Sequence, residues 1–559
     1  MVIVFATLCF RLGHLPLLQP DEGRNAEVGR EMKASGAWLV PTYNGVDYLD
    51  KPAFYFKAVA LSLAAFGDNE TAARLPSAAF GVALVVMVFA FARKVYGRSC
   101  GLLAAIIVGT MPLFLANART VIFDIALAFF VCGAIFAGYL AEEAEGRTRR
   151  NWYLLGAAAA GLATLVKGPV GFLIPALVLL VFQRMEGRRG VWKRLLAPLN
   201  LLMFFAVTLP WFVGLCLAHR DFLHYGLVEE SFNRFTTAKK FHRSEPVYFY
   251  ALIVMGTFLP WSLVLPEAAW ATWRERWARH RADRLCLVWS VLVVVFFSIS
   301  QSKLPGYILS VTVACGLLVA RLFDTALAQP GGRVARLVGR ATTAFGVLCL
   351  ALAVVAIAGS PHVPALAKPL RIPLADAARL GQCVLPLAIL LTGFGVFALV
   401  ARFRRSVALS FLCLALFTPL FVNVNLGVFD VIFSAKTARN LARALPPLPP
   451  GTELACLECF PNGLPFYLGR TATLITRDGG ELTSNYILFG LTKQASWPRN
   501  LVPVGQLEAW LASRKTPVFL IVRPEDRAKL ERLAAARAVP VQTLPRDYLG
   551  ALLPAPGGP

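Results

Sequence analysis

Residues 120–140 read TVIFDIALAFFVCGAIFAGYL, and Asp124 is the only charged residue among them. Because about 20 apolar residues in an α-helix cross the hydrocarbon core of a bilayer, this stretch predicts a membrane-spanning helix. Arginines follow at positions 147, 149 and 150, as is typical of a loop on the cytoplasmic side. The same alternation of apolar runs and basic loops continues along most of the chain, and it decides the fold class.

The composition of the whole chain agrees with a membrane protein. Of the 559 residues, 57% are hydrophobic and 16% are charged, against about 25% charged residues in a soluble domain. This excludes an ordinary cytosolic enzyme and a disordered chain. We predict an α-helical polytopic membrane protein with thirteen spans. The expected spans are 1–18, 74–92, 99–118, 120–140, 151–166, 168–183, 196–217, 246–267, 285–301, 305–320, 341–360, 383–401 and 406–427.

The basic residues predict how the chain is oriented in the membrane. The formal net charge of +24 would by itself also fit a nucleic-acid-binding protein. The basic clusters, however, fall on every second loop, so we place these loops in the cytoplasm and expect no nucleic-acid partner. The N-terminus then lies inside and the C-terminus outside. The basic loops are 93–98, 147–150, 184–194, 274–284, 321–340 and 402–405.

The remaining loops are longer and mixed in charge, and we place them outside. Within the first of them, residues 21–32 predict a helix. Residues 53–66 are apolar, but a crossing there would turn every later basic loop outward, so we predict a helix at the outer interface. Residues 1–18 lack a basic n-region and a small-residue cleavage site, so we expect a membrane helix rather than a cleaved signal peptide. The outer loops include 19–73, 218–245 and 361–382.

The composition changes after residue 430. We predict a membrane domain over 1–430 and a small soluble α/β domain over 431–559 on the outer side. Cys456 and Cys459 resemble a CxxC redox pair, but residues three apart on a strand face opposite sides, so a disulfide would need a break in the strand. The expected strands are 452–459, 472–476, 485–491 and 517–523, and the expected helices are 434–445, 504–514 and 525–537.

Charged residues near the membrane are costly to place there and are therefore candidates for function. All of the candidates fall on the predicted outer side. Carboxylates and cations together suit a reaction in which an anionic group such as phosphate leaves while a carboxylate orients or deprotonates a nucleophile. The candidates are Asp21, Glu22, Arg24, Asp50, Lys51, Arg119, Asp124, Arg234, Lys303 and Tyr307.

Several candidates also have a purely structural alternative. Asp21 would serve as the N-cap of a solvated helix. Lys51 would only extend its amine to the membrane surface, and Arg119 would form an ion pair with Asp124. Lys167 lies in an outer hairpin and needs no function. The His and acidic residues of loop 218–245 leave a divalent metal ion as an alternative, without a diagnostic spacing of ligands.

These motifs resemble, in their order, those of a known family. Residues 21–32 (DEGRNAEVGREM) resemble the first-loop motif of the membrane glycosyltransferases of the GT-C fold that use lipid-linked donors. The nearest branch is the ArnT-like aminoarabinose transferases, and the protein O-mannosyltransferases are more distant relatives. The resemblance covers about residues 1–430. The further motifs are Asp50-Lys51-Pro52, Arg119 with Asp124, Lys167-Gly168-Pro169 and residues 302–307 (SKLPGY).

The resemblance implies a role for each matching residue. Asp21 would be the main catalytic carboxylate and Asp124 a second active-site acid. Lys51 would bind the polyprenyl phosphate of the donor. The same phosphate site would be lined by Arg234, Lys303 and Tyr307. Further contacts to substrate would come from Glu22, Arg24, Asp50 and Arg119.

The resemblance further implies inverting transfer of 4-amino-4-deoxy-L-arabinose from undecaprenyl phosphate to lipid A, at the periplasmic face of a bacterial inner membrane. We expect a monomer without a required cofactor. Asn25 and Ala53 stand where the family often has Tyr and Pro, so the identity of the sugar and that of the acceptor stay open. The acceptor is either a lipid A phosphate or a hydroxyl group, including a hydroxyl group of a protein. A polyprenyl-lipid transporter would need buried mid-span charges and usually internal repeats. A structural assembly partner would leave the motifs unexplained.

Overall fold

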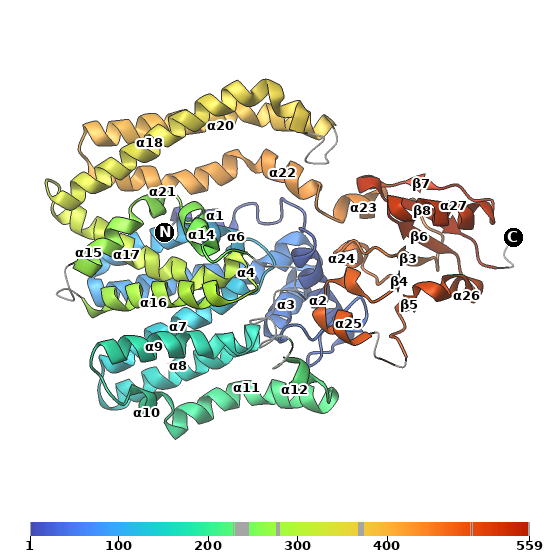
Figure 1. The fold of residues 1–559 in the computed structure, drawn as a ribbon, viewed down its shortest axis with the longest axis horizontal. Coiled ribbons are helices and arrows are strands. Elements are labelled where there is room, and N and C mark those ends of the chain that lie inside the picture. Colours follow the sequence, from blue (N-terminus) through green and yellow to red (C-terminus); the bar gives the residue numbers. More distant parts are fainter. Residues whose placement is uncertain are drawn as a thin grey trace. The chain divides into compact units, whose positions relative to one another are not determined.

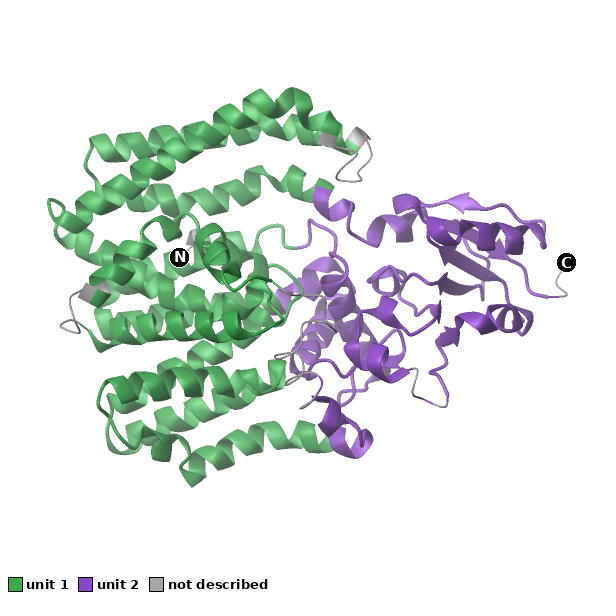
Figure 2. Ribbon diagram, in the orientation of Figure 1, with its two compact units in different colours: residues 1–12, 77–214, 231–431 green, residues 13–76, 215–230, 432–559 purple. Residues whose placement is uncertain are grey.

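The computed structural model describes residues 2–226, 229, 245–274, 280–366, 374–491, 494 and 496–556. The chain forms two compact units, which are coloured separately in Figure 2. Residues 13–76 cluster with the C-terminal residues rather than with the helices that follow them in sequence. Unit 1 comprises residues 1–12, 77–214 and 231–431, and unit 2 comprises residues 13–76, 215–230 and 432–559.

Unit 1 is built from α-helices, and three helices, α4 (Glu70–Tyr96), α11 (Pro198–Ala218) and α22 (Leu426–Ser434), continue from one unit into the other. Helices α18 and α20 pack side by side (Figure 1). The other α-helices are α1 (Val2–Cys9), α5 (Arg98–Thr110), α6 (Pro112–Ala118), α7 (Asp124–Glu142), α8 (Gly146–Lys167), α9 (Val170–Met185), α10 (Val191–Leu195), α14 (Phe249–Thr257), α15 (Leu265–Arg274), α16 (Arg281–Ile299), α17 (Leu309–Ala328), α18 (Arg333–Gly359), α20 (Leu374–Phe403) and α21 (Val407–Val424). Short 3₁₀ helices cover Trp261–Leu263, Pro305–Ile308 and Ser360–Leu366.

The prediction of a polytopic α-helical membrane protein is confirmed. Within the described ranges, eight helices are long and apolar enough to cross a membrane. Helices α5 and α6 bend by 68° at Met111, before Pro112, and count as a ninth span if they are taken together. Helix α3 (Phe54–Phe66), in the segment expected at the interface, has 13 residues and is shorter than a span.

Besides the bent segment 99–118, the helices at 151–166 and 168–183 are not among these eight, and two further expected spans, 1–18 and 246–267, are interrupted. The segment 1–18 is helical only in α1, because Arg11 adopts a left-handed backbone conformation (φ 51°) that a right-handed helix does not contain. The segment 246–267 is broken into α14, a 3₁₀ turn and α15 around Pro260, which has no N–H group to continue the helical hydrogen bonds.

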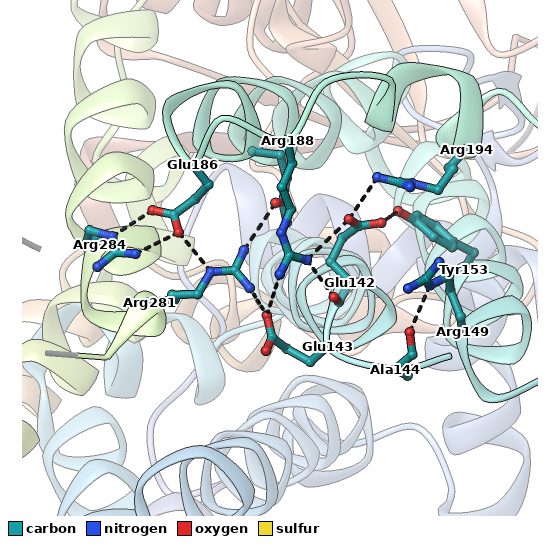
Figure 3. Close-up of polar contacts among 11 residues, drawn as sticks. Glu142, Glu143, Ala144, Arg149, Tyr153, Glu186, Arg188, Arg194, Arg281 and Arg284 are labelled. Carbon is teal, nitrogen blue, oxygen red and sulfur yellow. Dashed lines mark hydrogen bonds and ion pairs between the residues drawn. The ribbon is translucent and has the colours of Figure 1, made fainter. Parts of the chain in front are cut away.

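Three of the basic loops meet at one end of the helices of unit 1, where they surround glutamates (Figure 3). Arg281 and Arg284 both bind Glu186, with a shortest N–O distance of 2.6 Å to Arg284. Burial would raise the pKa of Glu186, but the hydrogen bonds from the two arginines hold it below its ordinary value. Buried Glu142 accepts hydrogen bonds from Arg194, Arg188 and Tyr153. The cluster therefore ties together α7, α8, α10, α16 and the residues that follow α9.

Unit 2 combines the first outer loop with a C-terminal sheet. The outer loop forms α2 (Asp21–Ser35), the hairpin strands β1 (Thr42–Tyr43) and β2 (Val46–Asp47), and α3. The later helices are α12 (Phe222–His224), α23 (Arg439–Ala444), α24 (Leu464–Leu468), α25 (Asn485–Gly490), α26 (Leu507–Ala512) and α27 (Arg527–Ala535), with 3₁₀ turns at Gly480–Leu482, Val504–Gln506, Pro524–Asp526 and Pro545–Asp547. The strands are β3 (Glu453–Leu457), β4 (Thr473–Thr476), β5 (Leu501–Pro503), β6 (Val518–Val522), β7 (Gln542–Thr543) and β8 (Leu549–Leu553).

The C-terminal sheet has six strands in the order β5-β4-β3-β6-β8-β7 (Figure 1). Strands β3 to β6 are parallel, and β8 runs antiparallel to β6 and β7. All five residues of β6 are buried, as is typical of a central parallel strand covered on both faces. Leu520 and Val522 lie in a core with Leu511 of α26 and Leu530 of α27, so these helices cover one face.

Three of the four expected C-terminal strands, and the helix after Pro524, are confirmed. The fourth expected strand, 485–491, is wrong because this segment forms α25. Ser484 caps that helix by accepting a hydrogen bond from the Ile487 N–H group, which favours a helical turn over the strand that the apolar residues indicated. Strands β5, β7 and β8 were not predicted.

Cys456 and Cys459 are free thiols. The strand does break between them, since Glu458 has a left-handed backbone (φ 46°). A hydrogen bond with Cys459, together with burial, raises the pKa of the Cys456 thiol well above its ordinary value. Because the thiolate is the reactive species, this environment disfavours the redox interpretation.

Candidate functional site

Asp21 is the first residue of α2, and its side chain is 50% exposed. Arg24, one turn later, donates from Nη2 to Asp21 Oδ1 at 2.6 Å. The alternative of Asp21 as an N-cap is wrong, because Pro20 occupies that position and no side chain caps the helix. The alternative of a solvated helix is also wrong, since every residue from Glu22 to Met32 is buried.

Arg24 is held from both sides. Its Nη1 donates to the carbonyl oxygen of Thr483 at 2.9 Å and to the Thr483 hydroxyl at 2.8 Å. Its guanidinium also lies over the Tyr48 ring at 5.7 Å. Burial lowers the pKa of Arg24, but its acidic and phenolic neighbours together raise it above its ordinary value, so the side chain stays a cation; these neighbours are Tyr48, Asp21, Asp50 and Tyr43. Arg24 therefore fixes one oxygen of the Asp21 carboxylate.

Glu22 is a structural residue. Its carboxylate accepts hydrogen bonds from Arg74 Nε at 2.8 Å and Arg74 Nη2 at 2.9 Å, and both side chains are 2% exposed. The Leu18 N–H group also donates to Glu22, and Arg74 donates to the carbonyl groups of Leu15 and Pro16. This buried pair anchors the start of α2, which does not support the expected contact of Glu22 with substrate.

Asp50 and Lys51 follow the β1–β2 hairpin. The Asp50 carboxylate is buried and accepts four hydrogen bonds, from the Tyr225 hydroxyl at 2.6 Å, the Ser484 hydroxyl at 3.2 Å and the backbone N–H groups of Asn485 and Tyr486 at 2.9 Å each. Lys51 Nζ donates to the Asp50 carbonyl oxygen at 2.7 Å. Asp50 thus fixes the backbone that carries Lys51.

Asp124, Lys167 and Tyr307 come together in unit 1. Asp124 begins α7 and forms an ion pair with Lys167, the last residue of α8. Lys167 Nζ also lies 4.4 Å from the centre of the Tyr307 ring. A Cβ atom on Gly306 would lie 3.0 Å from Asp124 Oδ2, so the glycine lets the 302–307 motif approach this carboxylate. Sequence reasoning left Lys167 without a function, although its KGP motif was a usable signal.

Arg119 and Lys303 make other contacts within unit 1. Arg119 donates to the carbonyl groups of Thr7, Leu8 and Phe10, at and just beyond the C-terminus of α1, as basic side chains commonly do at helix ends. Lys303 is buried, and its Nζ donates to the Ser300 carbonyl oxygen at 2.7 Å.

Two further predictions from the sequence concern Arg234 and a metal ion. Arg234 lies outside the described residues. Across the described part of the chain, no group of three or more His, Cys, Asp or Glu side chains is arranged to hold a metal ion.

The site residues thus form two groups. One group, around Asp21, Arg24, Asp50 and Lys51, belongs to unit 2, and the other, around Asp124, belongs to unit 1. Each group joins a carboxylate to a cation. A carboxylate can orient a hydroxyl or amino group or remove a proton, and a cation can stabilise a departing phosphate.

Comparison with known proteins agrees with this chemistry. Residues 50–213 match a family described as dolichyl-phosphate-mannose-protein mannosyltransferase. An undecaprenyl phosphate-α-4-amino-4-deoxy-L-arabinose arabinosyl transferase from Sodalis glossinidius is 34% identical over 355 residues, which is 63% of each chain, so less than two thirds of that relative is matched. An enzyme of the same name from Edwardsiella ictaluri is 30% identical, over 68% of this chain and 67% of its own.

The fold gives a more complete match. The crystal structure of ArnT from Cupriavidus metallidurans bound to undecaprenyl phosphate superimposes with a TM-score of 0.82 and 27% identity, over 99% of this chain and 96% of that one. Its apo form gives a TM-score of 0.80. The chain therefore belongs to the ArnT-like family of undecaprenyl phosphate–aminoarabinose transferases.

Proposed function

We propose that this protein is a glycosyltransferase of the bacterial inner membrane. It transfers 4-amino-4-deoxy-L-arabinose from undecaprenyl phosphate to lipid A at the periplasmic face, with inversion at the sugar C1. The names of its relatives and the lipid phosphate bound in the Cupriavidus structure support the donor. With this function we propose thirteen spans, a cytoplasmic N-terminus, a transferase domain over 1–430, a periplasmic α/β domain over 431–559, and a monomer.

The observation that carries the proposal is the exposure and hydrogen bonding of the Asp21 carboxylate. The other carboxylates of α2, on Glu22, Glu27 and Glu31, are buried and accept hydrogen bonds from the protein. Among the carboxylates of this helix only that of Asp21 is half exposed, and one of its oxygens is held by Arg24. A carboxylate that is oriented by a buried cation and still open to solvent suits contact with a substrate.

In the reaction, the bond between the sugar C1 and the phosphate breaks as the acceptor oxygen attacks C1. The phosphate leaves as an anion, and Lys51 stabilises its charge. With a hydroxyl acceptor, Asp21 removes the acceptor proton as a general base. A lipid A phosphate needs no base, and Asp21 then orients the sugar, for example through its 4-amino group.

Unit 1 supplies the second acid. Asp124 forms an ion pair with Lys167, whose amine lies over the Tyr307 ring, and this arrangement supports a role in orienting the donor phosphate and sugar. Arg119 holds the end of α1, so we assign it to the scaffold.

The test uses the purified full chain in lipid nanodiscs, with undecaprenyl-phosphate aminoarabinose and lipid A. Mass spectrometry should find lipid A heavier by one aminoarabinose unit. A product seen only with a peptide acceptor would favour the protein-glycosylating alternative. Movement of the donor between leaflets without any new product would favour a transporter and refute the proposal.

A further inference from the structure

A short segment of the C-terminal region, residues 483–486 (TSNY), contacts both ends of the first outer loop. It follows β4 and the 3₁₀ turn Gly480–Leu482, and it runs into α25. Leu482 and Ile487, on either side of it, are buried and anchor it to its own part of the fold. All of these residues belong to unit 2.

The first contact leads to Asp21. Thr483 offers two acceptors to the same nitrogen of Arg24, its carbonyl and its hydroxyl, and Arg24 in turn holds Asp21 Oδ1. Thr483 has a left-handed backbone (φ 55°, ψ 31°), which is a strained conformation for a β-branched residue. Strain of this kind persists only where surrounding contacts impose it, and it is concentrated at functional sites.

The second contact leads to Lys51. Ser484, Asn485 and Tyr486 together supply three of the four hydrogen bonds to the Asp50 carboxylate. A carboxylate has about four lone-pair positions for donors, so these bonds and that of Tyr225 leave Asp50 with little capacity for substrate. Asp50 precedes Lys51 directly, and its carbonyl oxygen accepts the Lys51 amine.

We propose that residues 483–486 are a positioning segment of the transferase site, which orients Asp21 through Arg24 and places Lys51 through Asp50. The inference rests on the function proposed above, and it changes the role of Asp50 from substrate contact to positioning. The C-terminal region is then a working part of the site rather than a separate cap with a ligand of its own.

The proposed effect of the segment on Lys51 is tested at Asn485. Asn485 is the first residue of α25 and Ser484 before it is extended (φ −107°, ψ 126°), so proline fits the backbone and removes, besides the side chain, the N–H group that donates to Asp50. The matched reference is Asn485→Ala, which lacks the same side chain but keeps the N–H group. We expect Asn485→Pro to show a KM for the lipid-linked sugar about tenfold above that of Asn485→Ala, with similar kcat. Binding of undecaprenyl phosphate alone should weaken in parallel.

The proposed effect of the segment on Asp21 is tested at Thr483. Thr483→Val removes the hydroxyl acceptor and keeps the branched shape, whereas Thr483→Ser keeps the hydroxyl. We expect kcat of Thr483→Val to lie about tenfold below that of Thr483→Ser, with the donor KM unchanged, because a less well oriented Asp21 affects the transfer step. If Asn485→Pro fails to fold, the Thr483 pair decides the question alone.

The two proposals fail in different ways. If the wild-type chain transfers no sugar to any acceptor, the proposed function is wrong. If the wild-type chain transfers sugar and the members of each pair have equal KM and kcat, residues 483–486 are only structural and this inference is overturned.

Discussion

The buried pair Glu22–Arg74 yields a quantitative prediction. Replacement of Arg74 by Met removes four hydrogen bonds, two to Glu22 and two to the carbonyl groups of Leu15 and Pro16. Both side chains of the pair are 2% exposed, so Glu22 would be left as a buried charge without its cation. Breaking a buried ion pair in this way costs about 3–5 kcal/mol.

This cost should be visible in thermal unfolding. At about 2–4 °C per kcal/mol for a unit of roughly 200 residues, the apparent Tm of Arg74→Met should fall by about 6–20 °C. Differential scanning fluorimetry of the detergent-solubilised protein measures the shift. Transfer activity should fall as well, because α2 starts with Asp21 directly before Glu22.

Two further variants test the reasoning. Arg93→Met makes the same chemical change at an exposed position of the same helix, and its Tm should stay within about 2 °C of wild type. The double variant Glu22→Met, Arg74→Met removes both charges and should be more stable than Arg74→Met alone. A Tm for Arg74→Met equal to that of Arg93→Met, or a double variant no more stable than Arg74→Met alone, would contradict the assigned role of the pair.

Three other predictions concern single residues. Asp21→Asn should lower kcat by about two orders of magnitude or more with normal membrane insertion, and retained transfer would remove Asp21 from catalysis. Lys51→Ala should mainly raise the KM for the lipid-linked sugar, which an unchanged KM in the same assay would contradict. The pKa of Glu186 is held below its ordinary value of 4.5. The pairing of Glu186 with Arg281 and Arg284 therefore stabilises the fold fully above pH 4.5, and this stabilisation is lost as the pH falls through the lowered pKa. Glu186→Gln should therefore flatten the decline of apparent Tm as the pH falls below about 5, and an unaltered decline would assign it to other groups.

Several functional features could be predicted from the sequence. The polytopic class followed from run lengths and charges that act within one helix. Asp21 and Lys51 could be proposed as site residues because their motifs are contiguous in the sequence. Lys167 was set aside, since its partner Asp124 lies 43 residues earlier and only helix packing joins them.

Local contacts explain both the wrong strand and the different partners of neighbouring motif residues. The segment 485–491 has the apolar residues of a strand, but a helix starts there instead. Ser484 caps this helix, and the N–H groups of Asn485 and Tyr486 donate hydrogen bonds to Asp50. Glu22 and Arg24 share one motif with Asp21, yet one binds Arg74 and the other binds Thr483. Side chains two residues apart on a helix, as Glu22 and Arg24 are, point to different sides, so the motif alone did not separate their roles.

The sequence by itself determined that this chain is a membrane protein and which motifs are the candidates for its chemistry, because hydrophobic length and contiguous motifs are local properties. Only the tertiary structure decided which charges are available for that chemistry. Arg24 meets Thr483 across 459 residues, and Asp50 meets Tyr486 across 436. A buried charge must find a partner wherever the fold supplies one. That requirement leaves Asp21 open on α2 and commits Glu22 and Asp50 to holding the site in place.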